Sequence, residues 1–334
     1  MSPSPSLPLS PEPSLSLTPR RTPSLGMRLA ALYVRCGRLP ERSPEALRAS
    51  YGRRRTPRPA APTWAIRRVA HIHAERQAHG GEEGVVYTLT PRRAAPGAQG
   101  GGWGALYLHG GGFVNPLHRA HWDIVAALVR VTGATVTLPL YPLCPERPRA
   151  AALAWLDAVY ARLAAAHPPS RLIALGDSAG AHHALTLALR LRDAGAPLPA
   201  RLALFSPWLD LTLSRPEVPA VAPLDVMLRP AELREWGRWW AGADDPASPT
   251  LSPLFADLRA LPPTDVFAGT HDVLWPEARA LRDRAAEAGW ALSLHEAPGG
   301  FHDFMAATFT PEARAVYARL AAALGLGRGA VAPL

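Results

Sequence analysis

The sequence of 334 residues contains no lysine, so all 36 of its basic residues are arginine. A loop that cradles a nucleotide phosphate needs the pattern G-x-x-x-x-G-K-[ST], and the lack of lysine excludes it. The chain also has no apolar run of the roughly 20 residues that a membrane-spanning helix requires. We therefore expect neither phosphate-loop chemistry nor stable membrane insertion.

Cysteine is scarce as well, with Cys36 and Cys144 alone. Two isolated thiols in no metal-like or redox-like spacing cannot form a disulfide framework, which is typical of a reducing compartment. An arginine pair at residues 20–21 precedes an apolar stretch, but further arginines interrupt that stretch and no small-residue cleavage site follows. These features predict a cytoplasmic location.

The net charge of +9 is unevenly distributed along the chain. Residues 1–76 carry 14 arginines against four acidic residues, whereas residues 77–334 carry 22 arginines against 23 acidic residues. A basic arm can contact nucleic acid or a membrane surface. The aromatic and basic residues are not interleaved as they are in nucleic-acid modules, so we expect a solvated helix and tail and no nucleic-acid partner.

Composition divides the chain into segments. Residues 1–26 are rich in serine and proline and are predicted to be a disordered tail. Residues 27–78 are basic and partly amphipathic, which predicts a segment of two or three short helices. Residues 79–327 have the composition of a large α/β domain, interrupted at residues 213–250 by a proline-rich section and a tryptophan-containing helix.

From about residue 84, short apolar strands alternate with helices. Strands are expected at 85–90, 104–109, 134–140, 171–177, 201–207, 264–269 and 292–297, and helices at 118–131, 148–166, 179–193, 275–289 and 311–324. This alternation predicts an α/β fold with a mostly parallel central sheet flanked by helices.

The segment Gly176-Asp177-Ser178-Ala179-Gly180 follows a predicted strand and opens a predicted helix. This is the pattern G-x-S-x-G in the strand–turn–helix setting of a nucleophile elbow, where a strained turn exposes the serine hydroxyl above the sheet. Small flanking residues allow the strand and the helix to pack closely. Ser178 is therefore the candidate nucleophile.

A serine nucleophile needs a base to take its proton and an acid to orient that base. In this strand–helix setting the acid and then the base follow the serine along the chain. Asp272 lies just past one predicted strand, and His302 follows the next strand and a glycine pair. Both lie at the carboxyl edge of a parallel sheet, where such sites assemble, so Ser178, Asp272 and His302 form the predicted catalytic triad.

Alternatives exist for the acid and the base. Glu277 is the strongest alternative acid, although we expect it one turn into the following helix. His271 adjoins the proposed acid, and His295 is expected to be a strand-face residue. Asp303 follows the proposed base and is expected to point away from its neighbour's imidazole.

Histidine clusters suggest a metal site only weakly. His182 and His183 follow the serine, and three more histidines lie at positions 71, 73 and 79. A catalytic zinc needs three convergent ligands on a scaffold such as H-E-x-x-H, and neither group has one. We expect ordinary helix or surface histidines, with no metal and no cofactor.

The motifs together resemble the hormone-sensitive-lipase-like branch of the α/β-hydrolase superfamily, of the bacterial esterase and lipase type. The matching segments occur in the family's order and cover roughly residues 80–325: LHGGGF at 108–113, LYPLCPERPRAA at 140–151, GDSAG at 176–180, SPWLDLT at 206–212, SPLFADLRALPP at 252–263, GTHDVL at 269–274 and FHDF at 301–304. The resemblance implies an α/β-hydrolase fold with a helical cap built from residues 27–78 and 213–250.

The resemblance also implies roles for individual residues. An oxyanion hole would be formed by the backbone N–H groups of Gly111 and Gly112, in the HGGG motif, and of Ala179. His109 would anchor this loop, and replacing either glycine with valine would cripple turnover with little loss of stability. The candidate substrate-binding residues are Phe113, Trp236, Trp239 and Trp240, although the three tryptophans are equally compatible with a place in the core.

Three departures from the family pattern stand out. Ala181-His182 replaces the common glycine and asparagine, Trp275-Pro276-Glu277 replaces an acidic pair, and the H-G-F around the base is His302-Asp303-Phe304. The first and third departures alter the walls of the pocket. The second removes a carboxylate near the loop that carries Asp272, which we call the acid loop. None removes a catalytic group.

The function expected from these features is a serine hydrolase that cleaves carboxylic esters of short to medium acyl chains through an acyl-enzyme. The same groups would serve a deacetylase, an amidase or a lactone hydrolase acting on a specialised metabolite. A non-catalytic ligand-binding relative is a third interpretation. The expected partner is a small-molecule ester. The sequence does not decide between a monomer and a homodimer.

Overall fold

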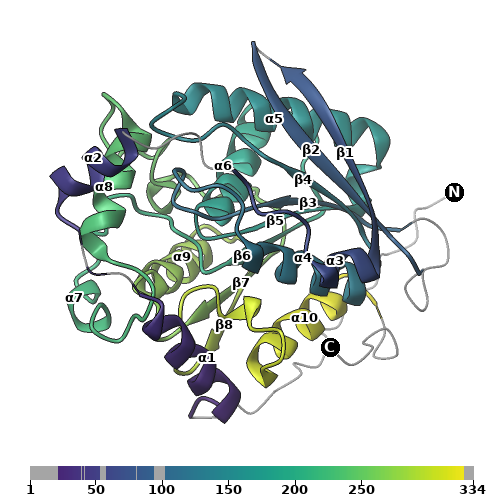
Figure 1. The fold of residues 1–334 in the computed structure, drawn as a ribbon. Coiled ribbons are helices and arrows are strands. Elements are labelled where there is room, and N and C mark those ends of the chain that lie inside the picture. Colours follow the sequence, from purple (N-terminus) through teal and green to yellow (C-terminus); the bar gives the residue numbers. More distant parts are fainter. Residues whose placement is uncertain are drawn as a thin grey trace, which may run out of the picture.

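The computed structural model describes residues 22–38, 40, 42–52, 58–79, 81–93 and 102–326. Within these residues, eight strands form one sheet in the order β1-β2-β4-β3-β5-β6-β7-β8 (Figure 1). The strands are β1 (Ala70–His79), β2 (Glu82–Pro91), β3 (Gly104–Leu108), β4 (Thr135–Pro139), β5 (Leu172–Asp177), β6 (Arg201–Phe205), β7 (Thr264–Gly269) and β8 (Leu292–Ala297).

The sheet is parallel from β4 through β3, β5, β6 and β7 to β8, whereas β2 pairs with both β1 and β4 in antiparallel fashion. Every residue of β3, β5 and β7 is buried. Such continuous burial is expected where helices cover both faces of a parallel sheet.

Five long helices cover the sheet, and shorter ones complete the fold. The long helices are α4 (Arg119–Thr132), α5 (Arg149–Ala166), α6 (Ala179–Asp193), α9 (Trp275–Glu287) and α10 (Pro311–Ala323), and the three-residue 3₁₀ turns are η1 (Pro169–Arg171), η2 (Pro253–Phe255) and η3 (Phe304–Ala306). The five helices and seven of the strands lie within a few residues of their predicted positions, so the predicted α/β fold is confirmed.

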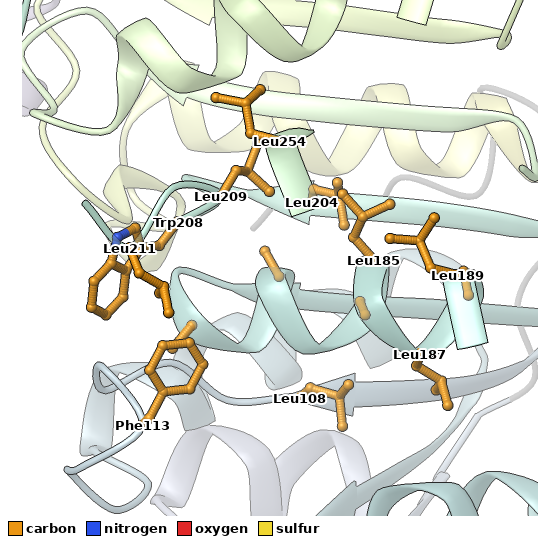
Figure 2. Packing of buried hydrophobic residues seen from close by; sticks show 14 of the residues in the cluster. Leu108, Phe113, Leu185, Leu187, Leu189, Leu204, Trp208, Leu209, Leu211 and Leu254 are labelled. Atoms are coloured by element: carbon orange, nitrogen blue, oxygen red, sulfur yellow. The ribbon is translucent and has the colours of Figure 1, made fainter. Parts of the chain in front are cut away.

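Two apolar clusters pack on the opposite faces of the sheet. Successive side chains of a strand point to opposite faces, so Ala105 and Tyr107 join the cluster with α4 and α10. Leu106 and Leu108 join the cluster with α5, α6 and α9. Figure 2 shows part of this second cluster, in which Leu185 lies next to Leu204.

The first strand departs from the prediction. Residues 70–78 belong to a segment predicted to be helical, and that prediction is wrong there because they form β1, which pairs with β2 from Ala70↔Pro91 to His79↔Glu82. The strand carries little apolar content beyond the alternating Ala70, Ile72 and Ala74. That alternation is the period-2 signal of a strand, but it is weak next to the polar and charged residues that make up the rest of the strand.

The N-terminal tail is described only in part. Residues 1–21 of the tail predicted to be disordered lie outside the described residues. For residues 24–26 the prediction is wrong, since Ser24 caps helix α1 (Leu25–Cys36) and the helix begins at Leu25. The N–H and hydroxyl of Ser24 donate to Glu312 at 2.7 and 2.8 Å, and the Ser24 hydroxyl caps α1 by accepting from the Met27 N–H.

The two segments predicted to form a cap contact each other. They contain α2 (Pro44–Gly52) and α3 (Trp64–Val69) from the first segment, and α7 (Val218–Val221) and α8 (Pro230–Ala241) from the second. Helices α2 and α8, far apart in the sequence, lie side by side (Figure 1). Arg48 Nε donates to Glu235 Oε1 at 2.5 Å, and the rings of Tyr51 and Trp239 meet edge to face at 5.0 Å.

Candidate active site

Ser178 lies on a sharp turn between β5 and α6. Its backbone has φ 53° and ψ −119°, a conformation that costs a non-glycine residue on the order of 1–3 kcal/mol. A Cβ atom on Gly180 would overlap the Leu108 carbonyl, and one on Gly176 would overlap the backbone of Gly180. The small residues around Ser178 are therefore required by the close approach of strand and helix, as the sequence predicted.

His302 and Asp272 are brought together by the ends of neighbouring strands. Asp272 follows β7, His302 follows β8, and His302 Nδ1 lies 2.9 Å from Asp272 Oδ2. The other Asp272 oxygen accepts from the Leu274 N–H at 2.9 Å. Both side chains are buried, so the carboxylate is positioned to hold the imidazole in one orientation.

Asp303 does not point away from the imidazole, and the prediction that it does is wrong. Its Oδ2 lies 3.2 Å from His302 Nε2, on the side of the ring opposite Asp272. The reason is the left-handed backbone of Asp303 (φ 54°, ψ 35°), which turns the side chain back toward the preceding residue. Within the described residues no hydrogen bond joins Ser178 Oγ to His302.

Opposing effects act on the protonation of His302. Burial by itself lowers the pKa of the imidazole, but the carboxylates of Asp272 and Asp303 more than offset it and raise the pKa well above its ordinary value. The protonated imidazolium is thus stabilised by a carboxylate beside each ring nitrogen.

The three glycines of the HGGG motif have distinct surroundings. The Gly110 N–H donates to Asp177 Oδ2 at 2.9 Å, whereas the N–H groups of Gly111 and Gly112 make no hydrogen bond within the described part of the chain. Gly111 has φ 120° and Gly112 has φ 62°, conformations that favour glycine. Two N–H groups next to the serine turn thus stay available to an external acceptor.

Neither Gly111 nor Gly112 has room for a side chain. A Cβ atom would lie 2.5 Å from the Asn115 carbonyl oxygen at Gly111 and 2.5 Å from the ring of Trp236 at Gly112. The expectation that valine at either position leaves stability almost intact is therefore wrong, since strain and overlap both act on the folded state.

A buried network centred on Asp177 supports the glycine loop. Besides the Gly110 N–H, the carboxylate accepts from the hydroxyl of Tyr107 and lies 3.1 Å from Nε2 of His121. Burial raises the pKa of Asp177, but His121 and the hydrogen bonds outweigh this effect and lower it. Asp177 lies inside the G-D-S-A-G motif, yet sequence reasoning assigned it no role.

His109 anchors the same loop, as predicted. Its Nδ1 lies 2.7 Å from the Gly110 carbonyl oxygen, and its ring stacks on Tyr141 at 4.4 Å. The Tyr141 hydroxyl in turn donates to the His109 carbonyl at 2.6 Å. Burial lowers the pKa of His109 to about 3, so this ring stays neutral and structural at ordinary pH.

The four candidate substrate-binding residues fall into two pairs. Phe113 and Trp240 are buried and stack on each other at 4.4 Å, and Figure 2 shows Phe113 among the residues of the apolar cluster, near Trp208. Trp236 and Trp239 are partly exposed, and Trp236 lies against Gly112. A direct contact with substrate stays a prediction for all four, and the position of Trp236 favours it most.

Glu277, the alternative acid, is occupied elsewhere. It lies in the first turn of α9, as expected, and its carboxylate accepts from the N–H groups of Leu209 and Asp210 at 2.6 and 2.9 Å. Burial raises its pKa well above the ordinary value. His295 instead contacts Asp265 at 2.8 Å on the face of β8.

A cap carboxylate that sequence reasoning missed lies beside the acid loop. Asp225, in the 213–250 insertion, accepts from the Val273 N–H at 2.9 Å with one oxygen and from the N–H groups of Met227 and Leu228 with the other. It ties the cap to the residue that follows Asp272. No local motif marks it, because the contact joins segments 48 residues apart.

The histidines considered for a metal do not converge. His182 is buried and its Nδ1 lies 3.1 Å from the Trp208 carbonyl, while neither ring nitrogen of His183 has a hydrogen-bond partner among the described residues. Across the residues that the structure describes, no group of three or more His, Cys, Asp or Glu side chains is placed to hold a metal ion. The lack of a metal or cofactor stays a prediction.

The fold and the site define a class: a mostly parallel sheet carries a serine on a strained strand–helix turn, and a histidine–aspartate pair lies on neighbouring loops. The model of the alpha/beta hydrolase fold family matches residues 105–306. The chain belongs to this family.

Relatives and solved structures agree with this assignment. An acetyl-hydrolase of Streptomyces hygroscopicus is 37% identical over 198 residues, covering 59% of this chain and 66% of the relative. An esterase of Acinetobacter venetianus is 33% identical over 219 residues, covering 65% and 72%. A crystal structure of an esterase from the bacterial hormone-sensitive lipase family superposes with a TM-score of 0.72 at 26% identity, covering 91% of this chain and 99% of that one. The resemblance to the hormone-sensitive-lipase-like branch is thereby confirmed.

None of the helices in the part of the chain that the structure describes has the length and apolar character needed to cross a bilayer.

Proposed function

We propose that this protein hydrolyses carboxylic esters of short to medium acyl chains through an acyl-enzyme formed on Ser178. The observation that carries the proposal is the 2.9 Å contact between His302 and Asp272 at the sheet edge where the strained Ser178 turn lies. The esterase and acetyl-hydrolase relatives support the same class of substrate, a small-molecule ester.

In the first step His302 Nε2 takes the proton of the Ser178 hydroxyl while the serine oxygen attacks the ester carbonyl. Asp272 stabilises the imidazolium that forms. The carbonyl oxygen becomes an oxyanion, which the N–H groups of Gly111, Gly112 and Ala179 would receive. Ala179 is the first residue of α6, so its N–H has no partner within the helix and lies at the positive end of the helix dipole.

In the second step the imidazolium gives its proton to the leaving alkoxide, which departs as the alcohol. A water molecule then loses a proton to His302 and attacks the acyl carbon, and collapse of the new oxyanion returns the proton to Ser178 and releases the carboxylic acid. Each cycle consumes one ester and one water. A single oxyanion donor is worth about 3–4 kcal/mol of barrier in such reactions.

The cap supports the proposed preference for short to medium acyl chains. Trp236 of α8 lies against Gly112, so an acyl group held at the oxyanion loop must share this space with the indole. The hydrogen bond from the Val273 N–H to Asp225 fixes the cap to the loop that carries Asp272. The acetyl-hydrolase relative favours acetyl esters as the first substrates to examine.

The test is Ser178→Ala, with Ser170→Ala as a matched control in the exposed turn η1. Turnover of p-nitrophenyl acetate and butyrate should fall at least about 10⁴-fold in Ser178→Ala and stay unchanged in the control. A fluorophosphonate should label the wild-type protein and leave Ser178→Ala unlabelled. Undiminished turnover in Ser178→Ala overturns the proposal, and absence of labelling in the wild type favours a non-catalytic ligand-binding protein.

A panel of acetyl esters, N-acetyl amides and lactones then separates an esterase from a deacetylase, an amidase or a lactone hydrolase. A cytoplasmic location, a homodimer and the lack of a nucleic-acid partner remain predictions from the sequence. Cys36 is exposed and Cys144 is buried, and the two form no disulfide with each other.

A further inference from the structure

Asp303 occupies an unusual position next to the proposed base. Its backbone is left-handed, and its N–H donates to Ser206 Oγ at 3.1 Å just before η3 begins. Left-handed backbone is uncommon outside glycine, and aspartate and asparagine are among the few residues enriched there. The local fold therefore holds this side chain in one direction, toward His302.

The carboxylate of Asp303 contacts the ring nitrogen that catalysis requires. Its Oδ2 lies 3.2 Å from His302 Nε2, and its Oδ1 is buried without a hydrogen-bond partner in the part of the chain that the structure describes. The opposite ring nitrogen is held by Asp272 at 2.9 Å. His302 is thus enclosed by two carboxylates, and the side chain of the histidine is 3% exposed.

Two acceptor carboxylates require an extra proton. A neutral imidazole carries a single N–H, which can serve one carboxylate, while its other nitrogen presents a lone pair. Engaging Asp272 on Nδ1 and Asp303 on Nε2 at the same time requires a second proton, either on His302 or on Asp303. That proton must leave before Nε2 can accept the proton of Ser178.

We propose that Asp303 is a positioning residue that reversibly occupies Nε2 of the catalytic histidine and sets the pH below which the hydrolase is idle. This inference rests on the proposed function, because it assigns a role toward the same base. Above that pH the extra proton is lost, the contact between Asp303 and Nε2 weakens, and Nε2 becomes free to face Ser178.

Other charged and titratable groups face Asp303 and His302 from the elements packed around them, and each of these groups makes different contacts. Asp177 is committed to the Gly110 N–H and to His121, and Asp225 to the backbone of the acid loop. These groups include Asp272 after β7, Asp225 from the cap, Asp177 from β5, Tyr107 from β3, His121 from α4 and Tyr317 from α10. Among the described residues, Asp303 is the carboxylate in contact with Nε2.

The direction of the expected pH shift follows from the pKa values of Asp303 and His302. Burial raises the pKa of Asp303 to about 6, and the two carboxylates raise the pKa of His302 well above its ordinary value. A base with a raised pKa stays protonated to higher pH, so kcat/KM falls as the pH drops through that value. Removing the Asp303 carboxylate lowers the pKa of His302 and moves this acid limb to lower pH.

The test uses Asp303→Gly and Asp303→Asn in the full chain. Glycine and asparagine both adopt left-handed backbone, and asparagine keeps the shape while removing the charge. We expect the acid-limb midpoint of kcat/KM to fall by about one pH unit or more, which makes each variant about fivefold more active relative to its plateau at one unit below the wild-type midpoint. If Asp303→Gly does not fold, Asp303→Asn provides the same readout.

Asp265→Asn is the matched control, because Asp265 contacts His295 at 2.8 Å in an aspartate–histidine pair on β7 and β8 that lies outside the site. Its acid limb should match the wild type. If an Asp303 variant loses rate equally at every pH and keeps the wild-type midpoint, this residue has only a structural role and the inference is overturned.

A second measurement needs no turnover. The imidazole nitrogens of His302, observed by NMR in ¹⁵N-histidine-labelled Ser178→Ala protein, should titrate at lower pH when Asp303→Gly is added. This titration does not depend on the proposed esterase activity. Failure of the inference on Asp303 is therefore distinguishable from failure of the proposed function. An identical His302 titration with and without the Asp303 carboxylate overturns the inference.

Discussion

Asp177 Oδ2 accepts a hydrogen bond from the Gly110 N–H at 2.9 Å, which ties the glycine loop to the last residue of β5, directly before Ser178. The nucleophile turn and the loop with the candidate oxyanion donors are thus held by one buried carboxylate. Loop and turn are 67 residues apart at this contact, so their relative position depends on it.

Asp177→Asn should destabilise the protein and reduce turnover. The carboxylate faces three donors, from Tyr107, Gly110 and His121. An asparagine in its place would point its own NH₂ donor at one of these donors and leave it without an acceptor. Leaving a buried donor without an acceptor costs about 1–3 kcal/mol. Urea unfolding followed by circular dichroism measures the loss, and the exposed Asp193→Asn at the end of α6 should stay within about 0.5 kcal/mol of the wild type. An unchanged midpoint for Asp177→Asn contradicts the proposed support of the loop.

Gly112→Ala should impair both folding stability and turnover. The added Cβ meets the Trp236 ring at 2.5 Å, and φ 62° strains any residue with a side chain. Gly195→Ala is a matched control, because Gly195 has φ 63° and nothing within 4 Å of the added atom. The control should lose about 1 kcal/mol from the left-handed backbone alone.

Part of the stability loss in Gly112→Ala comes from overlap with the Trp236 ring, and a second substitution should relieve that part. In a double-mutant cycle, Trp236→Ala should recover part of the Gly112→Ala loss in the free energy of unfolding, since the two sites are in contact. Additive effects of the two substitutions would show that Trp236 does not lie against the oxyanion loop in solution.

Glu235→Gln should loosen the cap. The Glu235 side chain is 1% exposed and accepts from Arg48 at 2.5 Å, Arg238 at 3.1 Å and Trp239 at 2.8 Å. Burial raises its pKa, but the hydrogen bond from Arg48 and the other donors lower it overall, so the group is ionised at neutral pH. Because Arg48 is 59% exposed and solvent screens it, we expect a modest loss of about 1–2 kcal/mol.

The loosened cap should raise KM more than it lowers kcat, because α8 also carries Trp236. Steady-state kinetics over an ester series measures the split. Asp257→Asn, which removes an exposed ion pair with Arg259, is the control and should change neither parameter. Equal KM values for Glu235→Gln and the wild type would place the substrate away from the cap.

His183→Leu should stabilise the protein. Both ring nitrogens of His183 are buried without partners, among the rings of Phe113, Tyr141 and Trp240. An apolar side chain of similar size removes this unsatisfied polar group, which should gain about 1–2 kcal/mol in the free energy of unfolding. His182→Leu is the contrast, since it loses the contact with the Trp208 carbonyl and should not be stabilising. A His183→Leu protein as unstable as His182→Leu would disprove the expectation.

The same histidine contributes to acid sensitivity. Burial lowers the pKa of His109 and His182 to about 3 and that of His183 well below its ordinary value. The unfolded chain therefore binds more protons below pH of about 6.5, so stability is fully present above this pH and is lost as the pH falls toward 3. His121 and His302 act in the opposite sense, because neighbouring carboxylates raise their pKa.

Unfolding midpoints in urea, measured between pH 7 and pH 4, should decline with falling pH. The decline should be shallower in His183→Leu than in the wild type. A parallel decline in both proteins would mean that another group dominates the acid response.

Local pattern was enough for most of the fold. Strands such as β5 are continuous apolar runs, and helices such as α6 follow them directly, so period and length identify both. The Ser178 turn was predicted because its strain requires small residues at fixed spacing, and the pairing of Asp272 with His302 because consecutive parallel strands end at the same edge. Strand β1 was missed because an edge strand with one exposed face carries little apolar content.

The sequence by itself thus determined the order of the elements and the positions of the candidate reacting groups, since both depend on local spacing. Tertiary structure alone decided which groups face them. Asp225 reaches the acid loop from the cap, Asp177 holds a loop distant along the chain, and Asp303 turns onto Nε2 of His302 because its backbone is left-handed. Hydrogen bonds between distant segments and the direction of a single side chain depend on three-dimensional packing, which no spacing of residue types along the chain encodes.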